Sequence, residues 1–170
     1  LRQVKPVVAV AEEMAVSGAY YLAVGTDYIY ANPASEVGSI GVIGFLPPLP
    51  MIYEDVVTTG PYKGWGTSRD TALRRMEMTK QGFYQAVQLS RGESLRVSAE
   101  VLLRGEAWSG AEAMRMGLVD ELGAHSQAIE RAARMAHISH YAVTDLKGQV
   151  SAPLSSEEAA DPSAHEPGLY

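Results

Sequence analysis

The 170-residue chain has no cysteine, which excludes disulfides, thiolate metal sites and cysteine nucleophiles together. Histidine is scarce as well. The four histidines are His125, His137, His140 and His165, and all of them lie in the last third of the chain. A histidine-based metal or catalytic centre would therefore have to be built from that third.

Positive charge is also limited. The chain has 14 Lys and Arg against 20 Asp and Glu, a formal net charge of −6, and it has no basic run. Because phosphate neutralisation needs clustered basic residues, we expect no nucleic-acid partner. The hydrophobic fraction of 46% is that of a packed globular protein, and the length corresponds to about one domain.

Long apolar runs are missing. No stretch approaches the roughly 18 consecutive apolar residues of a membrane span. The longest apolar region, residues 41–53, contains Pro47, Pro48 and Pro50 and cannot form one regular helix. Since the chain begins with Leu1 and almost at once enters an apolar run, we expect that an N-terminal part is absent from it.

The apolar patterns predict an α/β fold with a parallel sheet. Short runs that are apolar on both faces suit parallel strands covered by helices, and they alternate here with helical spacing. The predicted strands are Pro6–Ala11, Tyr28–Ala31, Val37–Ile43, Val56–Thr59 and Glu106–Trp108. The predicted helices are Ala19–Val24, Thr71–Arg91, Val97–Leu103, Gly110–Met116 and Ser126–Ala136.

The composition changes near residue 148. From there the chain is acidic, rich in proline and serine, and without Lys or Arg, so it has little to bury. We expect a folded domain over residues 1–147. We expect the tail over residues 148–170 to be disordered or docked on a surface of the protein or of a neighbour.

Ser17 has the most suggestive setting for a nucleophile. It lies between a predicted strand and a predicted helix and is followed by Gly18. Its hydroxyl would lie at the positive end of the helix dipole, and the Gly18 N–H could point at a developing oxyanion. Serine is also among the best helix N-cap residues, so a purely structural role stays open at this point.

Lysine and histidine are the candidate bases. No histidine lies within a hundred residues of Ser17, although His125 could approach it in space. Lys63 lies in a loop after a predicted strand, where Tyr62 and Trp65 could strip water from its amine and favour the neutral form that a base needs. The alternative is a solvated loop lysine. The chain has four lysines in all: Lys5, Lys63, Lys80 and Lys147.

Ser39 lies in the glycine-punctuated run Gly-Ser-Ile-Gly-Val. Its hydroxyl could hydrogen-bond the Lys63 amine and hold it toward Ser17. The alternative is that a small side chain is needed in a glycine-rich strand.

Several motifs, taken in order, resemble the signal peptide peptidase A family, the S49 family of Ser–Lys proteases in the Clp/crotonase superfamily. The run Val8 to Ala23, with Val16-Ser17-Gly18, resembles its nucleophile segment. The run Val37-Gly38-Ser39-Ile40-Gly41-Val42-Ile43 resembles the segment that follows, and Thr59-Gly60-Pro61-Tyr62-Lys63 resembles its Tyr-Lys base motif. Residues 105–123 are similar to its C-terminal signature, and the likeness extends from about residue 5 to residue 136.

The resemblance implies a role for each of four residues. Ser17 matches the nucleophile, Lys63 the general base, Ser39 the hydroxyl that orients Lys63, and Gly18 the oxyanion N–H. It implies a serine endopeptidase that cleaves apolar peptides such as signal peptide remnants, with neither metal nor cofactor.

The resemblance also implies a Clp/crotonase-like parallel sheet with flanking helices, whose first βαβ portion would precede Leu1. It further implies a homo-oligomer that associates with a membrane through a segment absent from this chain. We expect a bacterial or archaeal cell envelope as the location, with the chain itself soluble.

Two local departures from the family pattern are visible. Ala19 stands where the family usually has glycine, and its methyl group is expected to narrow the groove. Thr67-Ser68-Arg69 replaces the usual Ser-Pro-x-Arg, so that region is expected to be rebuilt. Two other functions stay open: a crotonase-type acyl-CoA enzyme, and a non-catalytic scaffold of the same fold.

Overall fold

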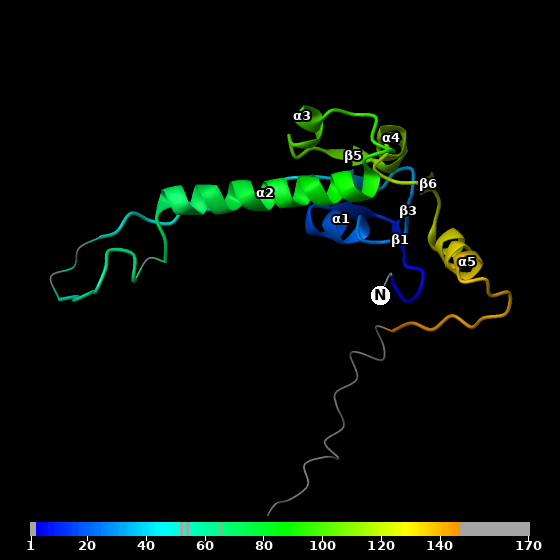
Figure 1. Ribbon diagram of the computed structural model, residues 1–170, viewed down its shortest axis with the longest axis horizontal. Coiled ribbons are helices and arrows are strands. Elements are labelled where there is room, and N and C mark those ends of the chain that lie inside the picture. Colours follow the sequence, from blue (N-terminus) through cyan, green and yellow to red (C-terminus); the bar gives the residue numbers. More distant parts are fainter. Residues whose placement is uncertain (1–2, 52, 54, 65, 147–170) are drawn as a thin grey trace, which may run out of the picture. The chain divides into compact units, whose positions relative to one another are not determined.

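The computed structural model describes residues 3–146 except residues 52, 54 and 65 (Figure 1). The chain divides into two compact units, of which the first ends at Ser139. The described part of the second, residues 140–146, contains no helix or strand. The tail predicted over residues 148–170 lies outside the described residues, and all the elements below belong to the first unit.

One three-stranded sheet is entirely parallel. Its strands are β1 (Val8–Ala11), β3 (Tyr28–Ala31) and β6 (Glu121–Leu122), in the order β1-β3-β6. All four residues of β1 are apolar, and helix α5 (His125–Met135) packs against this strand. The uninterrupted apolar sequence of β1 is therefore typical of a parallel strand that is covered by a helix.

The second three-stranded sheet carries the candidate nucleophile. Its strands are β2 (Met14–Val16), β4 (Glu36–Gly38) and β5 (Ala107–Ser109), in the order β2-β4-β5. Strands β2 and β4 are parallel, with Val16 opposite Gly38, whereas β5 runs antiparallel to β4. The carboxyl ends of β2 and β4 consequently lie next to each other.

Helices α2 (Arg69–Arg91) and α4 (Gly110–Met116) begin at recognisable caps. Helix α2 starts after Ser68, whose side chain accepts a hydrogen bond from the Thr71 amide at 3.1 Å. Helix α4 starts with a capping box between Ser109 and Glu112. The two remaining helices are short: α1 (Gly18–Ala23) and α3 (Ala99–Leu102).

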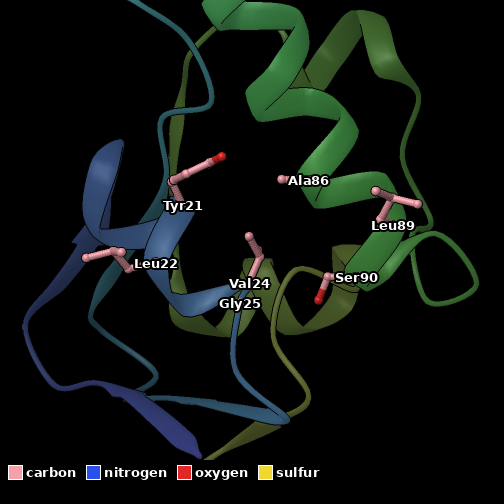
Figure 2. Close-up of a pocket in the computed structure, with 7 residues that line it drawn as sticks. All are labelled: Tyr21, Leu22, Val24, Gly25, Ala86, Leu89 and Ser90. Carbon is pink, nitrogen blue, oxygen red and sulfur yellow. The ribbon is translucent and has the colours of Figure 1, made fainter. Parts of the chain in front are cut away.

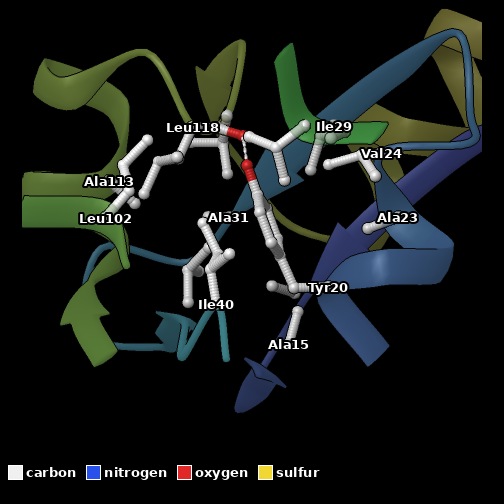
Figure 3. Packing of buried hydrophobic residues seen from close by; sticks show 14 of the residues in the cluster. Ala15, Tyr20, Ala23, Val24, Ile29, Ala31, Ile40, Leu102, Ala113 and Leu118 are labelled. Atoms are coloured by element: carbon white, nitrogen blue, oxygen red, sulfur yellow. Dashed lines mark hydrogen bonds between the residues drawn. The ribbon is translucent and has the colours of Figure 1, made fainter. Parts of the chain in front are cut away.

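The core is built around Tyr20 of α1 (Figure 3). Its ring is completely buried, and its hydroxyl donates a 2.8 Å hydrogen bond to the carbonyl of Leu118. Figure 3 shows Ile29, Ile40 and Leu102 packed in the same cluster, from three separate parts of the chain. The core thus joins the first helix to the turn before β6.

The α/β class is confirmed, and nine of the ten predicted elements lie on observed ones, most within about two residues. One prediction is wrong: Val56–Thr59 forms no strand, because this β-branched run pairs with no neighbour. The predicted strand Val37–Ile43 ends at Gly38, where the glycine has a φ of 112°. The short strands β2 and β6 were not predicted.

Candidate active site

Ser17 lies at the turn from β2 into α1. Its φ of 52° and ψ of −123° are unusual for a residue other than glycine, and such conformations are more frequent at functional sites. The backbone there is held on both sides: the Ser17 amide donates to Gly38 O at 2.8 Å, and Ser17 O accepts from the Tyr21 amide at 2.9 Å. The Ser17 side chain makes no capping hydrogen bond and is exposed.

The N-cap alternative can therefore be separated from the nucleophile hypothesis. A serine selected as a cap accepts a hydrogen bond from an amide in the first turn, as Ser68 and Ser98 do in this chain. Ser17 makes no such bond, so capping does not account for its hydroxyl.

An open cavity of about 480 Å³ adjoins Ser17. Its walls come from three segments that are distant in sequence: the start of α1, residues 41–43, and the middle of α2. Tyr21 and Phe83 meet edge to face there, with ring centroids 5.1 Å apart. The lining residues are Ser17, Gly18, Tyr21, Gly41, Val42, Ile43, Thr79, Gly82 and Phe83.

The α2 wall of this cavity was missed by sequence reasoning. Thr79, Gly82 and Phe83 are spaced three and four residues apart, so they share one face of the helix. A glycine in the middle of a long helix costs stability relative to alanine, which is the signal that could have marked this face.

Ser39 lies close to the same turn through strand pairing. Val16 of β2 lies opposite Gly38 of the parallel strand β4. Ser17 follows Val16 and Ser39 follows Gly38, so both serines come directly after a pair of neighbouring strand residues. The φ of Ser39 is 50°, and its amide donates to Glu106 O at 2.8 Å. The sheet therefore brings Ser17 and Ser39 to the same edge, as expected for residues that end neighbouring parallel strands.

Lys63 lies elsewhere in the described structure. It closes a turn in which its amide donates to Gly60 O at 3.1 Å, and it is exposed together with Tyr62. It is not among the residues described as lining the Ser17 cavity, and Trp65 lies outside the described residues. The single chain therefore brings together Ser17, Gly18 and Ser39 but not Lys63.

The other candidates are also placed. His125 is the first residue of α5, with its Nδ1 3.9 Å from a Glu12 carboxylate oxygen, and it does not line the Ser17 cavity as described. Ala19 lines a different hollow, between α1 and β1, and is not among the residues that line the Ser17 cavity. Within the described ranges, no three potential metal ligands cluster.

The Thr67-Ser68-Arg69 region, which departs from the family pattern, has a clear local role. Ser68 caps α2, and the Arg69 Nε donates to Pro47 O at 3.0 Å. The Arg69 contact joins the start of α2, which follows the Lys63 turn, to Pro47, which precedes that turn in the chain.

Helix α1, which begins directly after Ser17, is anchored in the core through Tyr20. The buried Tyr20 hydroxyl donates to Leu118 O, two residues before Asp120, which pairs with Arg91 at 2.7 Å. Burial raises the pKa of Tyr20, an effect that the nearby positive charge of Arg91 partly offsets. The phenol therefore stays protonated and keeps donating its hydrogen bond.

A second open cavity lies on the other side of Tyr21, between α1 and α2 (Figure 2). It has a volume of about 480 Å³ and includes Leu22 and Leu89, which are exposed. Figure 2 shows Tyr21 and Leu22 on the α1 side, with Ala86, Leu89 and Ser90 on α2. No candidate nucleophile or base of the sequence analysis lines this cavity.

Comparison with known proteins identifies the family. The sequence model of Peptidase family S49 matches residues 1–139, and the chain belongs to that family. The match ends where the first compact unit ends.

Two curated relatives are similar over most of this chain. Protease 4 of Salmonella typhi is 27% identical over 81% of this chain and 24% of its own length. The chloroplastic serine protease SPPA of Arabidopsis thaliana is 30% identical over 81% of this chain and 22% of its own length. This chain therefore spans about a quarter of the length of these relatives.

The solved structures with some likeness include enoyl-CoA hydratases. One from Polaromonas sp. JS666 has a TM-score of 0.41 and 22% identity, covering 78% of this chain and 39% of that chain. Because the TM-score is below 0.5, the α/β assignment rests on the observed strands and helices themselves. No described helix is both long and apolar enough to cross a membrane.

Proposed function

We propose that this protein is a serine endopeptidase in which Ser17 is the nucleophile and Lys63 the general base. The observation that carries the proposal is the setting of Ser17: an exposed, uncapped hydroxyl on a turn with positive φ, beside an open cavity. Membership of Peptidase family S49 favours this function over an acyl-CoA enzyme.

The proposed reaction has two steps. The neutral Lys63 amine takes the Ser17 proton while the Ser17 oxygen attacks the peptide carbonyl carbon, and Lys63 then gives that proton to the leaving amine. In the second step Lys63 takes a proton from water, and the water oxygen attacks the acyl carbonyl carbon. The ester bond to Ser17 then breaks, Lys63 returns the proton to the Ser17 oxygen, and the carboxylate product and the free serine are released.

Gly18 and Ser39 support these steps in the proposal. Gly18 is the first residue of α1, so its amide has no acceptor inside the helix and can bind the oxyanion. Ser39, at the neighbouring strand end, would accept or donate a hydrogen bond at the Lys63 amine and orient it toward Ser17.

The cavity chemistry supports apolar peptides as substrates. Beside Ser17 the walls are formed by Tyr21, Val42, Ile43 and Phe83, with glycines where the backbone would approach a substrate. Signal peptide remnants are rich in small and apolar residues, and they are the substrates that we propose for this cavity.

Lys63 must approach Ser17 for this reaction to proceed. It lies in the segment over residues 42–64, whose described residues are exposed except for the half-buried Pro47 and Gly60. Ile43, Phe45 and Val57 in this segment are almost completely exposed. An exposed apolar segment of this size is typical of an interaction surface. We include in the proposal a homo-oligomer and association with a membrane of the cell envelope.

The proposal is tested with cleavage of a quenched fluorescent apolar peptide. Ser17→Ala should reduce turnover at least about a thousandfold, because the covalent step is lost. Ser126→Ala, an exposed serine on α5, is the matched control and should leave turnover unchanged. Turnover that survives Ser17→Ala would refute the assignment.

A further inference from the structure

A polar cavity of about 450 Å³ lies away from Ser17, where α2 and α4 end. It is lined by three arginines, Arg91, Arg96 and Arg115, and by two carboxylates, Glu93 and Asp120. The lining is thus net positive in a chain whose formal net charge is −6. None of the residues of the Ser17 cavity lines it.

Arg91 is the fixed element of this cavity. Its side chain is only 8% exposed, its Nε donates to Gly117 O at 3.0 Å, and its Nη1 donates to Asp120 at 2.7 Å. Its Nη2 has no hydrogen-bond partner among the described residues, yet it is not sealed from solvent. A buried, oriented guanidinium with a spare donor thus lines an open cavity.

The carboxylates do not neutralise the other two arginines. Asp120 is occupied by Arg91 and by the Ile29 amide, which donates to its second oxygen at 2.7 Å. Arg96 and Arg115 are exposed and form no ion pair within the described ranges. Of the carboxylates that line the cavity, only Glu93 remains to oppose them, and Glu112, outside the lining, interacts with the charge of Arg115.

The helix ends nearby do not explain the arginines either. Carbonyl groups at the end of a helix attract cations, but several here already accept backbone hydrogen bonds. Gln88 O accepts from Gly92, Arg91 O from Leu95, Ala113 O from Leu118, and Met116 O from Arg96. The side chains of Arg96 and Arg115 therefore stay available for a ligand.

We propose that this cavity binds a small oxyanion ligand, through a phosphate or carboxylate group held by Arg91, Arg96 and Arg115. Planar guanidinium groups match both kinds of anion with paired hydrogen bonds. The cavity volume lies within the range of small-molecule sites, so the ligand can carry more than the anionic group.

Isothermal titration calorimetry of the 170-residue chain tests the site, with inorganic phosphate and succinate as separate probes at low ionic strength. We expect saturable binding of at least one probe. Tighter binding of phosphate would identify a phosphate ligand, and tighter binding of succinate would identify a carboxylate ligand. Heats that do not saturate with either probe would overturn the proposal.

The variants act in opposite directions. Arg96→Gln and Arg115→Gln should each weaken binding about tenfold, the loss of one charge-assisted hydrogen bond. Glu93→Gln should tighten it severalfold by removing the opposing charge. Arg104→Gln is the matched control, because Arg104 pairs with Glu100 outside the cavity, and it should leave the dissociation constant unchanged.

Arg91→Lys keeps the charge but loses the planar fork, so it should abolish binding in a protein that remains folded by circular dichroism. If this buried variant does not fold, the dissociation constants of Arg96→Gln and Arg115→Gln test the proposal instead. Dissociation constants equal to wild type in both would show nonspecific ion association and overturn the proposal.

Discussion

The region that holds Ser17 and the segment that holds Lys63 are stabilised in opposite ways. Around Ser17, Tyr20, Val37 and Ile40 are completely buried and the backbone is tied by strand pairing and hydrogen bonds. Over residues 42–64, Phe45 and Val57 are 99% and 100% exposed. The packed unit thus fixes the nucleophile, whereas the base lies on a segment in which most of the described residues are exposed.

This difference separates two parts of the proposed function. The geometry of Ser17 depends on contacts inside the first unit and should respond to changes in its core. The contribution of Lys63 depends on bringing the 42–64 segment to Ser17 and should respond to changes that leave stability untouched.

The largest expected effect is on activity. Lys63→Ala should lower peptide turnover at least about a thousandfold, since no proton acceptor remains for Ser17. The control is Lys80→Ala, because Lys80 pairs with Glu77 on α2 at 2.6 Å. Equal losses in both variants, or no loss in either, would contradict the assignment of Lys63. Melting temperatures near that of wild type would show that stability is unchanged.

Gly110→Ala should give the largest loss of stability. A Cβ at this buried position would collide with the carbonyl of Asn32, which belongs to the backbone and cannot move aside. We expect the free energy of unfolding to fall by about 3–5 kcal/mol in urea denaturation.

The matched control for that change is Gly64→Ala, in the exposed segment. A Cβ there has no heavy atom within 4 Å, so the free energy of unfolding should change by less than about 0.5 kcal/mol. Similar losses in the two variants would remove the contrast between the packed unit and the exposed segment.

Tyr20→Phe should have an intermediate effect. It removes a buried donor and leaves Leu118 O without that bond, which costs about 1–3 kcal/mol of unfolding free energy. Tyr84→Phe on α2, a half-buried ring that packs against the core cluster, is the control and should cost less than about 0.5 kcal/mol.

The same tyrosine predicts a pH dependence. Because burial raises the pKa of Tyr20 above its value in the unfolded chain, the folded state holds this proton more tightly. Its contribution to stability is present below pH about 10 and is lost as the pH rises further. Urea midpoints measured across that range should fall more steeply in wild type than in Tyr20→Phe; parallel curves would contradict this.

Ser68→Ala should have the smallest effect. The cap at the start of α2 is lost, which costs about 1 kcal/mol of unfolding free energy. Ser90→Ala, an exposed serine later in the same helix, should be within about 0.5 kcal/mol of wild type. A loss in Ser90→Ala as large as that in Ser68→Ala would contradict the role of the cap.

Helices and strands with a strong local sequence pattern were predicted well, and those with a weak pattern were not. Helix α2 was predicted within two residues because its apolar residues recur at helical spacing over a long stretch. Strand β2 has only three residues after two glutamates, too few to show a period. Val56–Thr59 has the composition of a strand, but strand formation depends on a partner that local sequence does not reveal.

The site was predictable where it depends on the order of elements along the chain. Ser17 at a strand-to-helix turn follows from local patterns, whereas Ser39 was expected inside the strand Val37–Ile43 and lies just after the end of β4 at Gly38. The α2 wall with Thr79 and Phe83 depends on how α1 packs on α2, which requires tertiary contacts. The distance of the Lys63 turn from the cavity likewise depends on packing that no motif encodes.

The most direct test of the central claim is labelling of the 170-residue chain with a fluorophosphonate probe, followed by mass spectrometry of the modified peptide. We expect a single modified serine, Ser17, with labelling abolished by Ser17→Ala and strongly slowed by Lys63→Ala. Labelling at a different serine, or an unmodified Ser17 in a folded chain, would contradict the account.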